Sequence, residues 1–269
     1  MKRKKSRPFW KWIAVACISL FCVAPLLWGL KVSIAPQYDT SIIPRRLTGE
    51  HYRYIFSRPE FFQYLRNSVV VSLSTVAFAL PLSLLGGYAL ARFNFPGKQF
   101  SFLFLVFPLL PLIAVLVPLV SFLNRLGLYN KLSALVVVNA VFNLPLTVWM
   151  LRNFIMEVPV EIEEAALVDG CSRIEALWKI TMPLAIPGLV AATVFIFITT
   201  WNNYLYASAL ITKPSLRVLP QGILAFIGTW GTYWGGLTAA GIITLIPPLV
   251  LFLLFQRWFI AGLFGQMLK

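Results

Sequence analysis

The chain has 269 residues, of which 59% are hydrophobic and only 12% are charged. Its mean hydropathy of +0.81 excludes an ordinary soluble domain of this length and predicts a membrane protein. The formal charge of +14 does not indicate nucleic-acid binding, because the basic residues flank apolar runs and form no stripe with base-stacking aromatic side chains. We interpret the positive charge as a topology signal that also contacts lipid headgroups.

Six stretches of the chain lack charged side chains, and each can supply the roughly 20 apolar residues of a membrane-spanning helix. They cover residues 12–30, 67–91, 99–124, 132–151, 184–212 and 218–256. Proline and glycine interrupt the first part of the last stretch, so we expect an external segment at 213–236 and a sixth span at about 237–257. The predicted fold is therefore an all-α integral membrane protein with six transmembrane helices.

The basic residues before the first span predict that the N-terminus lies in the cytoplasm. They are Lys2, Arg3, Lys4, Lys5, Arg7 and Lys11. With six spans, the C-terminus and the segment 152–183 lie on the same side, although the first external loop carries six basic residues of its own. We divide the chain into residues 1–66, with the tail, the first helix and the external loop, and a core of five helices at 67–269. The single histidine, His51, lies in the external loop, and we interpret it as a surface residue.

The six charge-free stretches that supply the predicted spans contain no Asp, Glu, His, Lys or Arg. Transporters that are driven by protons or sodium bury such groups near the middle of the membrane, so the energy for any pumping must come from elsewhere. The chain also lacks the G-x-x-x-x-G-K-[ST] phosphate loop and cannot be its own ATPase. The spans carry no catalytic constellation, and the three cysteines predict no metal site. We therefore do not expect an enzyme.

Six of the nine acidic residues fall between residues 157 and 188, which predicts a segment that lies in water and faces a partner protein. Pro159 is expected to open a short helix, with Glu161, Glu163 and Glu164 in the early turns where carboxylates interact well with the helix dipole. Gly170 permits a tight turn. Ser172 is then a candidate N-cap of a second short helix, with Glu175 as its capping-box partner.

The order of residues in this segment is Glu164-Ala165-Ala166, then Asp169-Gly170, then 180–183 with the letters ITMP. It resembles the EAA loop of the permease subunits of bacterial ATP-binding cassette importers. The surrounding chain resembles the carbohydrate-uptake branch, specifically the maltose-permease-like second subunit, from about residue 47 to the C-terminus. Supporting matches lie at 50–52, 91–97, 126–130, 201–202, 219–222 and 256–259.

The resemblance implies a cytoplasmic helix-turn-helix coupling loop at 153–186 that docks into a cleft of an ATP-binding subunit. Glu164 would make the charge contact, Ala165 and Ala166 would form the close-packing surface, Asp169 would be a cap or second polar contact, and Gly170 would make the turn. No cofactor is expected in this chain, since ATP and Mg²⁺ would be bound by the partner subunits. Cys171 departs from the smaller residue that the family usually has there.

The resemblance also implies a set of partners. We expect a second, homologous permease subunit, two ATP-binding cassette subunits and an extracytoplasmic sugar-binding protein, in the inner membrane of a bacterial cell, with both termini cytoplasmic. The external loops at 31–66, 124–131 and 213–236 are the surfaces on which the binding protein could dock. We expect contact with membrane lipid and none with nucleic acid.

Sugars are bound by amide and hydroxyl groups and by aromatic faces. Candidates for the translocation pathway in the fifth span are Trp201, Asn202, Asn203, Tyr204 and Tyr206. Asn139, Asn143 and Thr147 form a second polar stripe, since residues four apart share one helical face. Hydrogen bonds between helices explain Asn202 and Asn203 equally well, and the resemblance implies that the partner permease supplies most substrate contacts.

Alternative functions remain open at this point. The same machinery could import glycerol 3-phosphate or another polyol derivative, although no basic residue lies in a span. A passive channel is the alternative from a different class, and it would not need the docking loop.

Overall fold

A computed structural model describes residues 9–109, 111–228 and 231–265. Contacts divide the chain into two units. The first comprises the chain up to Phe61 together with Ile223–Ile246, and the second comprises Phe62–Gly222 and the chain from Pro247 onward. Residues 223–246 therefore belong to the same unit as the N-terminal part of the chain. The predicted division at residue 66 placed them in the core instead. Five of the six basic residues that decide the predicted orientation, at 2–7, lie outside the described residues.

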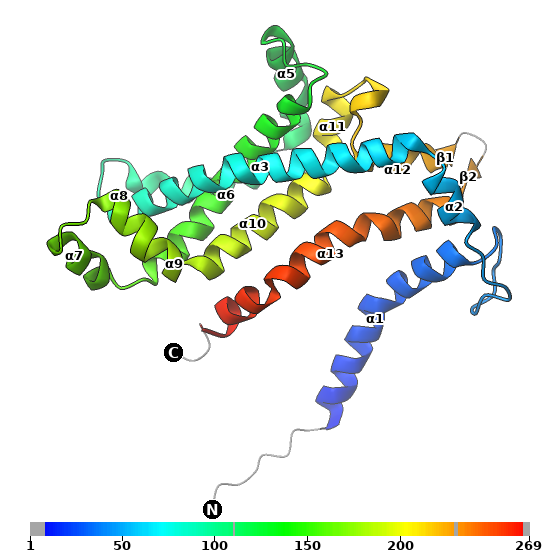
Figure 1. The fold of residues 1–269 in the computed structure, drawn as a ribbon, viewed down its shortest axis with the longest axis horizontal. Helices are drawn as coiled ribbons and strands as arrows, with labels where there is room; N and C mark the ends of the chain where they lie inside the picture. The colour runs from blue at the N-terminus through cyan, green and yellow to red at the C-terminus, as the bar shows by residue number, and fades with distance from the viewer. Residues whose placement is uncertain (1–8, 110, 229–230, 266–269) are drawn as a thin grey trace, which may run out of the picture. The chain divides into compact units, whose positions relative to one another are not determined.

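The second unit is built on three long helices that lie side by side, α3 (Pro59–Arg92), α6 (Leu132–Met156) and α10 (Ile186–Trp201) (Figure 1). Buried apolar side chains of α3 and α6, including Leu84 and Leu151, pack in one cluster. A hydrogen bond of 2.7 Å joins the hydroxyl groups of Ser83 and Thr147 inside this packing. Such pairs satisfy the hydrogen-bonding groups of polar side chains, with which lipid tails cannot form hydrogen bonds.

The third predicted span is a helix with a sharp bend. Its first half contains η1 (Lys98–Phe102), α4 (Leu103–Val106) and η2 (Phe107–Leu109), and its second half is α5 (Leu112–Arg125). The halves meet at an angle of 96°. Pro111 lies at this break and has no N–H to donate to a preceding turn, which is why one straight helix over 99–124 does not form.

The fifth predicted span is also interrupted. The helical segment Arg173–Leu184 meets α10 at 81°, and α10 ends at Trp201 rather than at residue 212. Asn203 then starts the short helix α11 (Tyr204–Leu210), because its side-chain oxygen accepts a hydrogen bond of 3.1 Å from the N–H of Tyr206. Among the described residues, four continuous helices are long and apolar enough to cross a membrane, or up to six if each bent pair forms one span.

Between α11 and the first unit the chain forms η4 (Pro214–Leu216) and α12 (Leu219–Ile223). The first unit itself contains α1 (Phe9–Ile34), α2 (Glu50–Phe56), η5 (Leu224–Phe226) and the beginning of α13 (Trp234–Gly265). Before α13, the two-residue strands β1 (Ile227–Gly228) and β2 (Gly231–Thr232) pair antiparallel, with Ile227 opposite Thr232. The fold is otherwise helical in the described part of the chain. α1 buries none of its most apolar stretch within this chain, as expected of a helix that faces lipid or another subunit.

The sixth predicted span corresponds to α13, which begins at Trp234, three residues before the predicted start. The first turn of this helix lies directly against the His51 ring. Only glycine fits at position 235, because a Cβ there would overlap the imidazole. His51 is only 1% exposed, so its interpretation as a surface residue is wrong. Its ring nitrogens are 2.6 Å from the Tyr233 hydroxyl and 2.8 Å from the Ala35 carbonyl oxygen, and these two contacts compensate for its burial.

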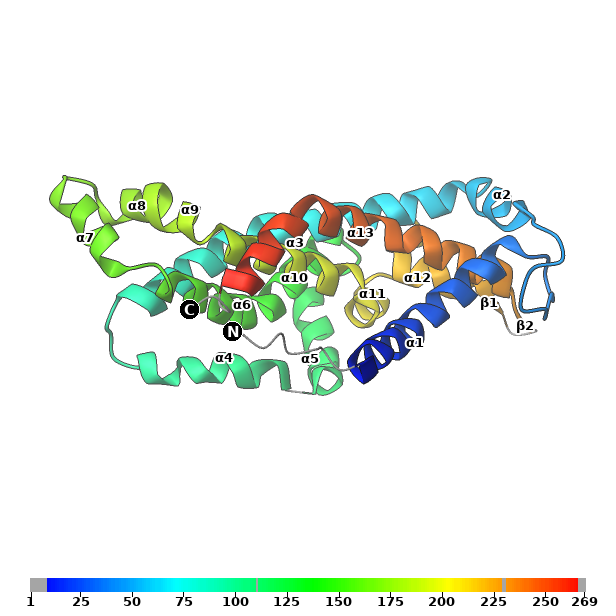
Figure 2. The same ribbon diagram turned by 90° about the horizontal axis from the view of Figure 1, so that it is seen from below.

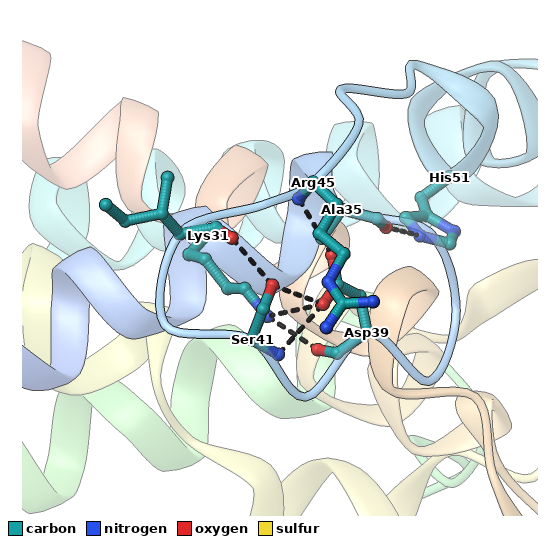
Figure 3. Close-up of polar contacts among 7 residues, drawn as sticks. Lys31, Ala35, Asp39, Ser41, Arg45 and His51 are labelled. Carbon is teal, nitrogen blue, oxygen red and sulfur yellow. Dashed lines mark hydrogen bonds and ion pairs between the residues drawn. The ribbon is translucent and has the colours of Figure 1, made fainter.

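The loop after α1 is organised by one carboxylate (Figure 3). Asp39 accepts hydrogen bonds from the backbone N–H groups of Ser41 and Arg45, at 2.9 and 3.2 Å, and from the Ser41 hydroxyl. Lys31 donates to the Asp39 carbonyl oxygen at 2.6 Å. The hydrogen bonds from Ser41 are the main reason that the pKa of Asp39 falls to about 2. The part of this arginine-rich loop from Asp39 to Arg45 is therefore held together by hydrogen bonds.

Candidate functional site

The acidic segment forms two short helices that are joined by a tight turn at one end of the α3, α6 and α10 group, as both ribbon views show (Figure 1 and Figure 2). The first, α7 (Val160–Val168), starts directly after Pro159 as predicted. Gly170 has a φ of +92°, a left-handed conformation that disfavours side chains with a Cβ. The N–H groups of Gly170 and Cys171 bond to the carbonyl oxygens of Leu167 and Ala166, at 3.1 and 3.0 Å. This pair of bonds is the Schellman motif that ends a helix, and the predicted turn is confirmed.

The predicted capping box of the second helix is also present. Ser172 Oγ accepts from the N–H of Glu175 at 3.3 Å, and Glu175 Oε2 accepts from the N–H of Ser172 at 2.9 Å. The helix is less regular than predicted. One α-helical turn, α8 (Arg173–Ala176), leads into a π-helical turn, η3 (Leu177–Thr181), and then into α9 (Met182–Leu184).

Acidification is expected to loosen this second helix. Hydrogen bonds, first from the Ser172 backbone and then from Lys179, lower the pKa of Glu175 from 4.5 to about 2. Because the pKa of Glu175 is lower in the folded protein than in the unfolded chain, its carboxylate stabilises the helix fully above about pH 4.5. This stabilisation is lost as the pH falls toward 2. Hydrogen exchange of 172–184, corrected for the intrinsic pH dependence, should therefore accelerate between pH 5.5 and pH 3. Glu175→Gln should abolish this acceleration, whereas the control Glu161→Gln, on the exposed side of α7, should retain it; equal acceleration in both would contradict the prediction.

Glu163 differs from its acidic neighbours. Sequence reasoning placed it with Glu161 and Glu164 as a water-facing carboxylate near a helix start, but Glu163 is 4% exposed, whereas the other two are exposed. The Arg92 guanidinium, at the end of α3, lies 2.9 Å from Glu163 Oε1. The Thr181 hydroxyl donates to the same oxygen at 2.5 Å. Helix α7 is thus tied both to α3 and to the second helix of its own loop.

Two further hydrogen bonds complete this buried network. The Tyr88 hydroxyl donates to Glu163 Oε2 at 3.2 Å, and Arg92 Nη2 donates to the Val158 carbonyl oxygen at 2.7 Å. A buried charge is tolerated only when it is paired and hydrogen-bonded, and here both ions meet that condition. The sequence carried one signal for this pair, since Arg92 directly follows the charge-free stretch 67–91. Which of the three early glutamates would turn inward was not apparent.

The outward face of the loop is exposed in the described part of the chain. Glu164, Ala165 and Asp169 are exposed, beside the apolar side chains of Val168 and Ile174. Ala166, which was predicted to share the packing surface with Ala165, is 7% exposed and faces inward. Charged and apolar groups that share a projecting tip form a surface suited to a protein partner.

The predicted polar stripe on α6 lies inside the helix group. Asn139, Asn143 and Thr147 are all buried. The Asn203 side-chain amide donates to Asn139 Oδ1 at 2.8 Å, and the Thr199 hydroxyl donates to Asn143 Oδ1 at 2.7 Å. These bonds join α6 to the end of α10, which is the inter-helix role that sequence reasoning left open.

The remaining pathway candidates differ in their burial. Trp201 is 1% exposed and stacks on Phe197, with ring centroids 5.5 Å apart. Asn202 and Tyr204 are exposed. Asn139, Asn143 and Asn203 instead border a cavity of about 180 Å³. Sequence reasoning missed Thr199, Phe142 and Phe107 in its lining, because apolar residues and a threonine within a span carry no distinctive pattern.

Residues 79–264 match the family that is described as the binding-protein-dependent transport system inner membrane component. The chain belongs to this family. The matched part of the permease includes Arg92, the acidic helix-turn-helix segment and the residues around the cavity. The resemblance that the EAA-like pattern indicated is confirmed.

Several characterised proteins are similar to this permease. It is 36% identical over 226 residues to the inner membrane ABC transporter permease protein YcjP of Escherichia coli (strain K12), covering 83% of this chain and 81% of that protein. It is 31% identical over 264 residues to the trehalose/maltose transport system permease protein MalG of Thermococcus litoralis, covering 96% and 95%. A bacterial ABC transporter involved in the import of the acidic polysaccharide alginate has a chain of the same fold, with a TM-score of 0.79, 20% identity and coverage of 93% and 95%.

Proposed function

We propose that this permease is a transmembrane subunit of an ATP-driven importer and forms half of the translocation pathway for a mono- or oligosaccharide. The projecting coupling loop carries this proposal, because Glu164 and its apolar neighbours are exposed on it and contact no surface among the described residues. Membership of a binding-protein-dependent transport family supports the same reading. The trehalose/maltose permease, similar over 96% of this chain, supports a sugar as the cargo.

The energy for transport comes from the partner ATP-binding subunits. One chain has one coupling loop, so a second, homologous permease is needed to present two loops to two ATP-binding cassette subunits, which bind ATP and Mg²⁺. Glu164 contacts a basic residue of the ATP-binding subunit, Ala165 allows close approach, Asp169 adds a polar contact and Gly170 keeps the turn. When the two ATP-binding subunits close, they push the loops together and reorient the spans.

The proposed orientation places both termini and the coupling loop in the cytoplasm of a bacterial cell. A sugar-binding protein then delivers its cargo from outside, to the loops at 31–66, 124–131 or 213–236. The ordered loop around Asp39 is rich in arginine and suits an acidic partner. Along the passage, the proposed pathway residues are Asn139, Asn143, Trp201, Asn202, Asn203 and Tyr204.

Uptake by cells tests this proposal. Deletion of the subunit should abolish the ATP-dependent uptake of one class among radiolabelled mono- and oligosaccharides, while passive entry stays unchanged. Reintroduction of the wild-type subunit should restore that uptake. Normal uptake of every tested sugar after deletion, or restoration by the subunit without ATP, would contradict the proposal; the second result would favour a passive channel.

A further inference from the structure

We infer that the 180 Å³ cavity beside α6 and α10 is a subsite for one neutral, hydroxyl-rich ring of the cargo, an inference that rests on the proposed function. All of its lining residues belong to the second unit. They are Phe107, Pro108, Asn139, Phe142, Asn143, Leu146, Phe195, Thr199, Asn203 and Tyr206. The lining therefore combines three asparagines and a threonine with aromatic rings.

The Tyr206 hydroxyl is the observation that points to a ligand. Tyr206 is 2% exposed and lines the cavity, yet its hydroxyl has no hydrogen-bond partner among the described residues. Buried polar groups are nearly always paired, because an unpaired one loses its bonds to water without replacement. A hydroxyl group of a cargo molecule in the cavity can both donate to and accept from this phenol.

The asparagines keep spare bonding capacity toward the same space. Asn139 and Asn143 each donate one side-chain N–H to a carbonyl oxygen four residues earlier, at 2.8 Å. An amide nitrogen has two such hydrogens and an amide oxygen has two lone pairs, so each side chain can make further bonds. Groups that offer both donors and acceptors match ligand hydroxyls, which also do both.

Aromatic lining residues supply apolar contact. Phe142 stacks on Tyr206, with ring centroids 5.0 Å apart, and its centroid is 5.5 Å from that of Phe107. A sugar ring has apolar C–H groups as well as hydroxyls, so it matches a lining that combines aromatic rings with amides. The volume is below the roughly 300–1,000 Å³ of pockets for drug-sized ligands, which suits one ring rather than a whole oligosaccharide.

The uncharged lining indicates which class of cargo the cavity can bind. None of the described lining residues is ionisable near neutral pH. A phosphate or carboxylate would lose its water here without gaining a cation, which is costly in a site of low polarity. The subsite therefore favours neutral sugars and polyols over glycerol 3-phosphate.

Ligand binding to the assembled transporter tests the subsite directly. The complex with its partner subunits, in lipid nanodiscs and without the binding protein, is titrated with radiolabelled glucose, maltose and trehalose. Tyr206→Phe removes only the hydroxyl and should raise the Kd of the bound sugar roughly three- to tenfold, the effect of one lost hydrogen bond. Ser208→Ala removes an exposed hydroxyl two residues further along α11 and should leave the Kd unchanged. Unlabelled glycerol 3-phosphate should not displace the sugar.

Each other outcome is decisive. An unchanged Kd in Tyr206→Phe, equal losses in both variants, or displacement by glycerol 3-phosphate would overturn the subsite. So would the absence of sugar binding to a complex that restores sugar uptake in cells, and in that case the proposed function would stand. If cells with the wild-type subunit take up no sugar, the proposed function itself fails.

Discussion

Glu164→Lys is expected to release the ATP-binding subunit from the complex and to abolish transport. Glu164 is exposed on α7 and takes no part in the buried network, so the fold of the loop should survive the change. Loss of one partner of an interfacial charge pair costs about 2–5 kcal/mol, and charge reversal adds repulsion from the basic group in the proposed cleft. Affinity should therefore fall at least about thirtyfold. Co-purification of the ATP-binding subunit with the tagged permease measures this loss.

A matched control lies on the same helix. Glu161 is also exposed and carries the same charge, but it lies outside the EAA-like pattern, so Glu161→Lys should retain most of the association. Equal losses in the two variants would indicate a general electrostatic effect rather than a specific contact. Retained association and transport in Glu164→Lys would count against the proposed coupling mechanism.

Arg92→Met is expected to detach α7 from the end of α3. The substitution leaves the Glu163 carboxylate buried without its cation, and such a broken pair costs about 3–5 kcal/mol. Exchange of the α7 backbone amides should accelerate at least tenfold, up to the limit that the local stability of the loop sets. Hydrogen-exchange mass spectrometry over 158–182 reports this directly.

A second substitution separates charge from shape. Arg92→Met combined with Glu163→Gln removes both charges and keeps the side-chain oxygen that Thr181 contacts, so the double variant should recover much of the lost protection. Arg125→Met removes an exposed arginine at the end of α5 and should leave exchange in α7 unchanged. If the double variant exchanges as fast as Arg92→Met, or if Arg92→Met matches the wild type, the buried ion pair does not hold the loop.

The Arg92–Glu163 pair also gives the coupling loop a mechanical connection. A force on the exposed face of α7 would pass through this network to α3, which extends over 34 residues. The same helix carries Ser83, whose hydroxyl bonds to Thr147 on α6. The elements that a partner would push are therefore packed against the helices that border the cavity.

Features that depend on neighbouring residues were predictable from the sequence. The apolar stretches indicated the spans because a helix that crosses a membrane needs a certain length of apolar chain. The turn at Gly170 and the capping box of Ser172 and Glu175 involve groups within a few positions of one another. The spacing of Asn139 and Asn143 placed them on one helical face. The family resemblance rests on the same kind of local order.

Contacts between distant segments were decided only by the tertiary structure. Glu163 and Glu164 are adjacent residues of one helix, about 100° apart around its axis, and only packing against Arg92 determines which carboxylate is buried. His51 is buried because Tyr233 and Ala35 meet it in space. The cavity at Tyr206 joins residues from the bent third span, α6, α10 and α11. Local sequence sets the shape and polarity of each helix, but the partner of a buried polar group depends on which other helix lies against it.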